Sequence, residues 1–446
     1  MKNCYFFILM IFFFSCAKKE NSLVYQNPNS SDIKLVMNSA LSHSEIEIPS
    51  TREGDLIHYT IDKNAFITLK DGDLEIEFYA TPSSSSEIIR EENNQFIFKG
   101  DLGKYNQSVF NIQAKFDHFL ENTILRNTQK DELESKISQL KSDLIKEIPT
   151  DLTQQEQLEI KEMIALDAAF LHIKHAIQTG YGRQEEYSIP QQYDIQNFNI
   201  DVIEKLYNEN FNYLSYYIPN YLNLMFLNDE IYQLAGEFYY DLRTDEFQNL
   251  DIEPRLKEMF VASTISESIN TQGLKDNNEA SLYQFLHDYP SYSHKEELIA
   301  ILKNNSTMKD GNVAPIIHAF DANGEIFHLK NHEGKVVYIN VWATWNENFN
   351  QQIKDIKALK SKYEGQDIEI ISLSVDRDQQ HWKDYIDYSG EIKNNIWTSK
   401  VDQFYSNYKV YTVPRFILID KNGKLINSFA PAPDSKELDE LIAEVL

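Results

Sequence analysis

The stretch VWATWNENFNQQ, residues 341–352, places polar and aromatic side chains at the start of a predicted helix. A helix N-terminus leaves backbone N–H groups unpaired and carries partial positive charge, so it can lower the pKa of a nucleophile such as a thiol. This stretch contains no thiol. Asn346 is a favourable N-cap residue, Glu347 suits the positive end of the helix dipole, and Phe349 can add apolar packing. The residues predict a well-formed helix start without a nucleophile.

The elements that must position this stretch form a predicted α/β domain over residues 306–446. The apolar run VVYINVW, residues 336–342, is typical of a central strand that is buried on both faces. An Asn-Gly pair at 422–423 lies between two short apolar runs and predicts a hairpin. Asp434 and Glu437 have the spacing of a capping box for the last helix.

The upstream part predicts a small antiparallel β domain followed by helices. In DLEIEFYAT, residues 73–81, apolar and acidic side chains alternate with the period of a strand, and Asp71-Gly72 before it favours a turn. Leu133 and Ile137 begin a stripe along one helical face. We therefore expect a multidomain α+β chain. Its expected boundaries are 32–115 for the β domain, 116–305 for the α-helical middle domain, and 306–446 for the C-terminal α/β domain.

The N-terminal residues predict a targeting segment. Lys2 precedes the apolar run YFFILMIFFF, which is too short to span a bilayer and suits a signal peptide. Ser15-Cys16 resembles a bacterial lipobox of the kind found in Bacteroidetes lipoproteins, although Phe13 replaces the usual Leu. This resemblance implies a lipoprotein signal at 1–16, a lipid on Cys16 and a polar tether at 17–31. An ordinary secretory signal is the alternative.

The composition limits the classes of partner and of chemistry. The net charge is −27, which argues against nucleic acid because nucleic-acid binding needs a basic surface. The 42% of hydrophobic residues suffices for folded cores. The sequence contains 2 cysteines, Cys4 and Cys16, both within the expected signal segment. Residues 17–446 therefore offer no thiol for catalysis or for a disulfide.

The C-terminal domain resembles the TlpA/ResA type of thioredoxin-like protein within the AhpC/TSA–redoxin superfamily. The resemblance rests on GKVVYINVWATW from Gly334, on ISLSVDRDQQHWKDYI, and on YKVYTVPRFILIDKNGKLI around Pro414. It implies a thioredoxin fold, a cis Val413–Pro414 bond, and an envelope-facing thiol–disulfide oxidoreductase as ancestor. In such relatives the proline loop offers backbone groups to an extended peptide. Upstream, LKDGDLEIEF and FIFKGDLGKYNQ resemble the β domain that precedes TlpA-like domains in Bacteroidetes lipoproteins.

The sequence departs from this family at its chemistry. Asn346 stands at the position of the nucleophilic cysteine and Phe349 at that of the resolving one. Disulfide exchange needs a thiolate to attack and a second sulfur to resolve the mixed disulfide. Neither side chain can do either step. Redox catalysis by this chain alone is therefore excluded on chemical grounds, and we expect no cofactor.

Other candidate sites favour structural roles. His172 and His175 share a helical face with Asp167, but no matching set from a second helix is visible, so no metal is expected. Three further histidines lack metal-ligand spacing, and the aromatic segment 207–226 is more typical of a core than of a sugar or peptide site. Gly-rich phosphate loops and Gly-x-Ser-x-Gly elbows are absent. The three further histidines are His318, His328 and His332.

These observations predict a lipid-anchored envelope lipoprotein that faces the periplasm and binds envelope proteins or peptides. The outer membrane is favoured over the inner one, and surface exposure stays open. Two alternatives are a thiol–disulfide oxidoreductase by family resemblance, and a scaffold lipoprotein that acts through its helical domain. The expected binding residues are Trp345, Asn346, Glu347, Asn348, Val413 and Pro414.

Overall fold

The structure is a computed structural model in which the chain divides into two compact units, residues 1–228 and 229–446. The boundary between them falls inside the segment 116–305 that the sequence predicts to be helical. Within the described residues, no helix is both long and apolar enough to cross a membrane. The structure describes residues 21–26, 33–38, 41, 45–72, 74–91, 95–123, 130–180, 197–211, 214, 217–218, 221, 244, 249, 251–346, 349–390, 394–410 and 412–446.

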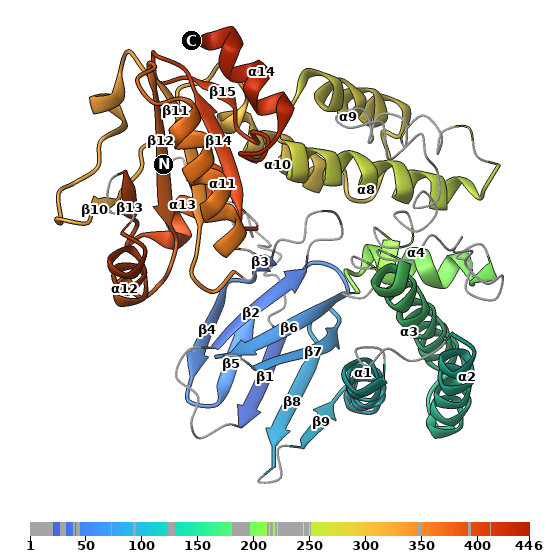
Figure 1. The fold of residues 1–446 in the computed structure, drawn as a ribbon. Coiled ribbons are helices and arrows are strands. Elements are labelled where there is room, and N and C mark those ends of the chain that lie inside the picture. The colour runs from blue at the N-terminus through green and yellow to red at the C-terminus, as the bar shows by residue number, and fades with distance from the viewer. Residues whose placement is uncertain are drawn as a thin grey trace, which may run out of the picture. The chain divides into compact units, whose positions relative to one another are not determined.

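The first unit contains two β-sheets that share one apolar core (Figure 1). One sheet has the order β4-β5-β1-β8-β9 and the other β3-β2-β6-β7. The turn predicted at Asp71-Gly72 is present and forms a hairpin, because β6 and β7 pair antiparallel with Asp71 opposite Leu74. The strands are β1 (Asn21–Gln26), β2 (Ile33–Asn38), β3 (Glu45–Glu47), β4 (Ser50–Glu53), β5 (Leu56–Tyr59), β6 (Ala65–Asp71), β7 (Leu74–Ala80), β8 (Ser85–Arg90) and β9 (Phe96–Gly100).

Strand β1 corrects the expected tether at 17–31. Residues 21–26 lie in the middle of a sheet, antiparallel to β5 and parallel to β8. Leu23 and Tyr25 alternate with Ser22 and Val24, and both are fully buried. This period-two burial stabilises a strand even though its neighbours in sequence are polar. The parallel pair also makes the β domain not purely antiparallel.

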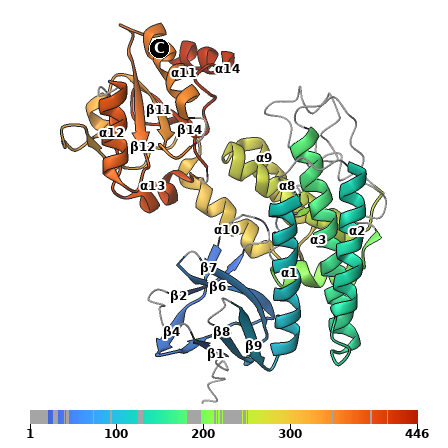
Figure 2. The ribbon, with the colours of Figure 1, turned by 60° about the horizontal axis from the view of Figure 1, so that its bottom comes forward.

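Helix α1 (Gly103–Thr123) runs beside both sheets and satisfies their edge strands with two adjacent amide side chains (Figure 2). Asn106 accepts from Tyr79 N–H at 2.7 Å and donates to Tyr79 C=O at 3.0 Å on β7. Gln107 accepts from Phe98 N–H at 2.9 Å and donates to Phe96 C=O at 3.1 Å on β9. Each amide therefore bonds an edge strand as a neighbouring strand would, which blocks further strand pairing there.

Three more helices of this unit are α2 (Lys130–Glu147), α3 (Gln154–Gly180) and α4 (Ile200–Asn208). A polar network links them to the sheet. Lys205 on α4 donates to Glu159 on α3 at 3.1 Å and to Glu209 at 2.7 Å. Tyr79 of β7 donates to Glu209 at 2.9 Å, and Tyr105 of α1 donates to Glu159 at 3.1 Å. Because one ammonium bridges two buried carboxylates that also accept from tyrosine hydroxyls, this network can stabilise the packing of four elements.

The second unit begins, in its described part, with helices α8 (Pro254–Gln272), α9 (Asp276–Asp288) and α10 (Lys295–Asn305). Glu253 caps α8 by accepting from the N–H groups of Arg255 and Leu256, with Pro254 at the first helical position. The turn between α8 and α9 contacts the sheet that follows, since Lys275 donates to Asn427 of β15 at 3.3 Å and forms an ion pair with Asp310. These helices and the α/β part therefore belong to one unit.

The C-terminal sheet has the order β10-β13-β12-β11-β14-β15, with parallel pairs at its centre and antiparallel pairs toward its edges. The predicted central strand 336–342 is β11, and every one of its residues is buried. The predicted Asn-Gly hairpin joins β14 to β15. The strands are β10 (Phe320–Asp321), β11 (Val336–Trp342), β12 (Ile368–Ser374), β13 (Asn395–Trp397), β14 (Arg415–Ile419) and β15 (Leu425–Asn427).

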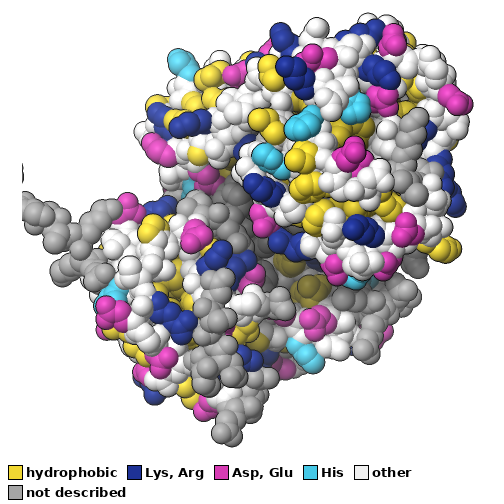
Figure 3. Space-filling model, turned by 90° about the vertical axis from the view of Figure 1, so that its left-hand side faces the viewer, with side chains coloured by type: hydrophobic (Ala, Val, Ile, Leu, Met, Phe, Trp, Pro, Cys, Tyr) yellow, Lys and Arg dark blue, Asp and Glu magenta, His cyan; other side chains and the backbone are white. Residues whose placement is uncertain are grey.

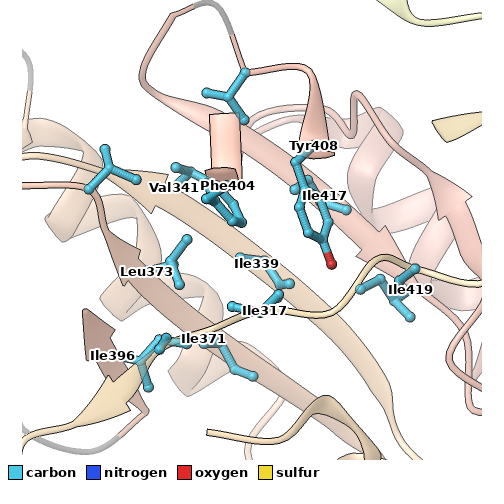
Figure 4. Packing of buried hydrophobic residues seen from close by; sticks show 14 of the residues in the cluster. Ile317, Ile339, Val341, Ile371, Leu373, Ile396, Phe404, Tyr408, Ile417 and Ile419 are labelled. Carbon is cyan, nitrogen blue, oxygen red and sulfur yellow. The ribbon is translucent and has the colours of Figure 1, made fainter. Parts of the chain in front are cut away.

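Helices cover this sheet and create two apolar layers. On one face Phe404 and Tyr408 of α13 (Val401–Tyr408) pack over Ile339, together with Ile317 from the segment before β10 (Figure 4). The opposite face carries α11 (Phe349–Lys362), α12 (Gln379–Ser389) and α14 (Lys436–Val445). The cap of α14 is Ser435, whose hydroxyl accepts from Leu438 N–H, so the predicted Asp434 cap is wrong. The chain thus folds as N-terminal β-sheets, helices and a C-terminal thioredoxin-like sheet.

Candidate functional site

The candidate site lies where β11 ends and the chain turns toward α11. Trp342, the last residue of β11, is buried against Trp382 of α12. The next residues leave the core, and Thr344 is held by Asp376 at the end of the adjacent strand β12. Its N–H donates to Asp376 Oδ1 at 3.0 Å and its hydroxyl at 2.7 Å. Sequence reasoning missed both residues, although an acidic residue directly after a buried apolar strand is a usable signal.

Asp376 is a rigid anchor for this turn. Its side chain is buried and also accepts from the Ser374 hydroxyl at 2.8 Å. Its backbone carbonyl accepts from the indole N–H of Trp397 at 2.6 Å. A carboxylate that is bonded on several sides holds its partners in one geometry. The backbone that leads to Trp345 and Asn346 is therefore fixed before the helix begins.

Asn346 joins this turn to the proline loop. Its side-chain Nδ2 donates to the carbonyl oxygen of Val413 at 2.7 Å, a contact between residues 67 positions apart. The Val413–Pro414 peptide bond is cis, as the resemblance implies. The structure thus brings together two parts of the expected site, the helix start and the proline loop.

Two residues beside this hydrogen bond are open to solvent. Trp345 precedes Asn346 and has 63% of its surface exposed. Pro414 follows Val413 and is also exposed. Each is the chain neighbour of one partner in the hydrogen bond, so the two flank the same contact. A large exposed aromatic side chain next to backbone hydrogen-bonding groups can offer both apolar and polar contacts to a ligand.

Several expected site residues lie outside the described residues. These are Glu347 and Asn348, the side chain of Phe349, and Cys16 with the whole segment 1–20. Helix α11 begins at Phe349, so the predicted N-cap bond of Asn346 to the helix remains a prediction. The side chains that are described at this site offer carboxamide, hydroxyl, indole and carboxylate groups. They can form hydrogen bonds and apolar contacts, and none of them is a nucleophile of the thiol class.

The histidines do not gather into a site. Among the described residues, no group of three or more His, Cys, Asp or Glu side chains is placed to hold a metal ion. His172 and His175 are buried in α3, as structural histidines would be. His318 and His328 are exposed on the C-terminal unit, and half-burial lowers the pKa of His332.

In the aromatic segment 207–226, the described apolar members are buried, in agreement with a core role. These are Tyr207, Phe211, Leu214, Tyr217, Ile218 and Tyr221.

A second surface of the C-terminal unit is partly apolar. Val313, Ile316 and Ile326 are each more than half exposed. Two cavities of about 340 Å³ flank the segment 327–332, one lined by Val313 and Ile316 and the other by Ile326. Figure 3 shows hydrophobic side chains on this side of the molecule interspersed with histidine, lysine and acidic side chains. Because positive and negative side chains are mixed on this surface, its charge does not identify a class of ligand.

Comparison with known proteins places the C-terminal part in context. The Thioredoxin-like family model matches residues 334–425. The thiol-disulfide oxidoreductase ResA of Bacillus cereus is 27% identical over 157 residues, which are 35% of this chain and 85% of that protein. ResA of Bacillus subtilis is 23% identical over 28% of this chain and 70% of that protein. A crystal structure assigned as a thiol-disulfide oxidoreductase of Bacteroides vulgatus is 34% identical, with a TM-score of 0.30, over 32% of this chain and 99% of that one.

Proposed function

Because the C-terminal third of the chain is a thioredoxin-like domain related to ResA/TlpA thiol–disulfide oxidoreductases, we propose that this domain binds extended polypeptide without exchanging disulfides. Trp345 and the Val413–Pro414 loop form the binding surface. The polypeptide belongs to proteins of the cell envelope, and the chain assists their assembly or stabilisation there.

The observation that supports this proposal most is the exposed Trp345 beside a proline loop whose conformation is intact. Asn346 reaches the Val413 carbonyl at 2.7 Å, so the loop and the helix start keep their register although both sulfurs are gone. The Thr344–Asp376 bonds hold the turn in place. A large aromatic side chain that is 63% exposed beside these backbone groups offers apolar area that a bound polypeptide can cover.

The proposal includes the absence of redox activity. Exchange requires a thiolate that attacks a disulfide sulfur and a second thiol that releases the product. Asn346 and Phe349 supply neither, and residues 17–446 contain no cysteine.

Cys16 is instead the point of lipid attachment, which anchors the chain in the envelope with its domains toward the periplasm. Substitution of Cys16 by Ala should therefore release the chain from the membrane fraction of cells.

A binding measurement tests the polypeptide-binding function. The probe is fluorescein-labelled α-lactalbumin that has been reduced and carboxymethylated, and fluorescence anisotropy gives its Kd. We expect Trp345→Ala to weaken binding by more than about tenfold, because exposed Trp anchors dominate such interfaces. Tyr388→Ala is the matched control, since Tyr388 is 90% exposed on α12 of the same domain. Equal binding by the wild type and Trp345→Ala would refute the assigned surface.

Disulfide reductase activity is the second candidate function, because the related ResA proteins are thiol-disulfide oxidoreductases. Insulin reduction in the presence of a thiol reductant separates the two. We expect no turnover above the buffer control for the wild type. The variant Asn346→Cys/Phe349→Cys should gain measurable turnover, because it regains both sulfurs at the helix N-terminus. Turnover by the wild type would overturn the proposal of a redox-inactive domain.

A further inference from the structure

The hydrogen bond between Asn346 and Val413 occupies the proline loop with the protein's own side chain. Asn346 Nδ2 lies 2.7 Å from the Val413 oxygen, a distance typical of a well-formed bond. The Asn346 N–H donates to Ala343 O at 3.2 Å, which directs the side chain from a tight turn toward the loop. The contact is half-buried and therefore partly shielded from competing water.

The donor in this bond has the chemistry of a peptide group. A primary carboxamide and a backbone amide present the same N–H to a carbonyl acceptor. An extended polypeptide that runs along the loop would offer its own N–H to Val413 O, as in strand addition. A cysteine at position 346 would compete poorly, because a thiol is a weak donor. The exchange of a thiol for a carboxamide therefore adds a competitor at the acceptor a peptide would use.

We infer that Asn346 is a gate residue for polypeptide binding, whose carboxamide must leave the Val413 carbonyl before an extended chain can bind there. The inference rests on the proposed function, since it assigns how the same surface is closed and opened. It also names the ligand class by its chemistry, a backbone segment with an unpaired N–H.

The surroundings confine the opening movement to one side chain. Thr344 is fixed to Asp376 by two hydrogen bonds, and Asp376 is buried and bonded to Ser374. The backbone before Asn346 is thus held by the core of the domain. Rotation about the side-chain torsions of Asn346 breaks the bond to Val413 without moving the backbone. The gate is a rotamer change of Asn346 that gives up the hydrogen bond to Val413.

Binding of the carboxymethylated α-lactalbumin probe to full-length variants tests the gate. We expect Asn346→Ala to bind the probe about 2- to 10-fold more tightly than the wild type, the range that corresponds to one net hydrogen bond. Asn346→Asp should bind equally tightly at pH 7, because its carboxylate cannot donate. Below the ordinary pKa of Asp, the protonated carboxyl donates again, so the gain of Asn346→Asp should disappear while that of Asn346→Ala stays. Asn422→Ala, an exposed asparagine of the β14–β15 turn, is the control.

The outcomes separate the gate from the function beneath it. If the wild type binds the probe, Trp345→Ala weakens it and Asn346→Ala leaves it unchanged or weaker, the gate is refuted and the binding surface stands. If no variant binds the probe, the proposed function fails and the gate fails with it. Amide exchange of the Asn346 side chain gives a direct readout by NMR. Its hydrogens should exchange faster with probe bound, and unchanged protection in the bound state would refute displacement.

Discussion

At the scale of single residues, position 346 carries a carboxamide at a helix start that contacts the proline loop. A carboxamide offers two N–H donors and one acceptor, whereas a thiol offers a weak donor and a nucleophile. The Val413 carbonyl takes the added donor at 2.7 Å. The turn therefore has a hydrogen bond to the proline loop at the position where a thiol could offer only a weak donor.

Asp167 on α3 is a second residue to consider, because ionisation of its side chain affects how stability depends on pH. It is 1% exposed, and neither carboxylate oxygen has a hydrogen-bond partner within the described part of the chain. Burial raises the pKa of Asp167 well above its ordinary value, and the nearby acids Asp117 and Glu77 raise it further. Above pH 3.8 the unfolded chain releases this proton while the folded chain retains it, so stability falls as pH rises.

We expect Asp167→Asn to remove this penalty. The variant should unfold about 2–4 °C higher than the wild type at pH 7, a shift that corresponds to about 1 kcal/mol in a unit of this size. The gain should vanish as the pH falls to about 4. Calorimetry from pH 4 to pH 8 measures it.

Asp143→Asn is the control for Asp167→Asn, and its predicted sign is opposite. Asp143 is exposed on α2, and hydrogen bonds from Gln139 and Lys146 lower its pKa. Its carboxylate therefore stabilises the folded state above the unfolded pKa, and that contribution is lost as the pH falls. Asp143→Asn should destabilise at pH 7 and have less effect in acid. A gain for Asp167→Asn that is equal at pH 4 and pH 8 would contradict the assignment of a buried ionisation.

At the scale of elements, periodicity in the sequence predicts those segments whose burial is regular. The central strand β11, the β6–β7 hairpin and the β14–β15 hairpin all follow from apolar pattern and turn residues. Strand β1 does not, because only two of its residues carry the pattern and polar sequence surrounds it. The cap of α14 is Ser435 rather than Asp434, since both types cap well and only packing selects one.

The candidate site, like the fold, could be predicted only in part from the sequence. The resemblance predicts that Trp345, Asn346 and Pro414 belong to one site, because each lies in a short motif of the family, and their role in binding stays a prediction. The Asn346–Val413 bond and the Thr344–Asp376 bond join loop residues that lie next to the ends of different strands. No local pattern encodes such a partner, so these contacts became visible only in the folded chain. Sequence reasoning considered the oxygen of Asn346 as a cap and left its nitrogen without a role.

Helix α1 yields a prediction at this scale, since Asn106 and Gln107 close the edges of two sheets. We expect Asn106→Ala to cost about 1–3 kcal/mol, because it leaves the N–H and C=O of Tyr79 buried and unsatisfied. Gln107→Ala should cost less, since its contacts are only half-buried. It should also promote association, because it opens the edge of β9 to another strand. Urea unfolding and sedimentation at several concentrations measure the two effects.

Asn122→Ala provides the matched control for the edge variants. Asn122 lies exposed near the end of the same helix, and its amide donates to the His118 carbonyl one turn earlier. Its loss should change the free energy of unfolding by less than about 0.5 kcal/mol. If Asn106→Ala is no more destabilising than Asn122→Ala, the edge bonds do not hold α1 to the sheets.

At the scale of the whole molecule, the chain forms two compact units, each with its own apolar core. The core of the first lies between its two sheets and includes Leu23, Ile67 and Phe78. The second has layers on both faces of the C-terminal sheet, with Ile339 on one of them. A closed core gives a unit its own free energy of unfolding, which residues of the other unit do not contribute to.

We therefore expect calorimetry to resolve two transitions that respond to different substitutions. Asp167→Asn should move only the transition of the first unit upward at pH 7. Ile339→Val should lower only the transition of the second unit. The expected loss in its free energy of unfolding is about 0.5–1.5 kcal/mol, which one buried methyl group contributes. The double variant should show both shifts unchanged, because distant sites in separate cores add. A single transition that both substitutions shift would show that the two cores unfold as one, and the C-terminal domain could not then be assigned a stability of its own.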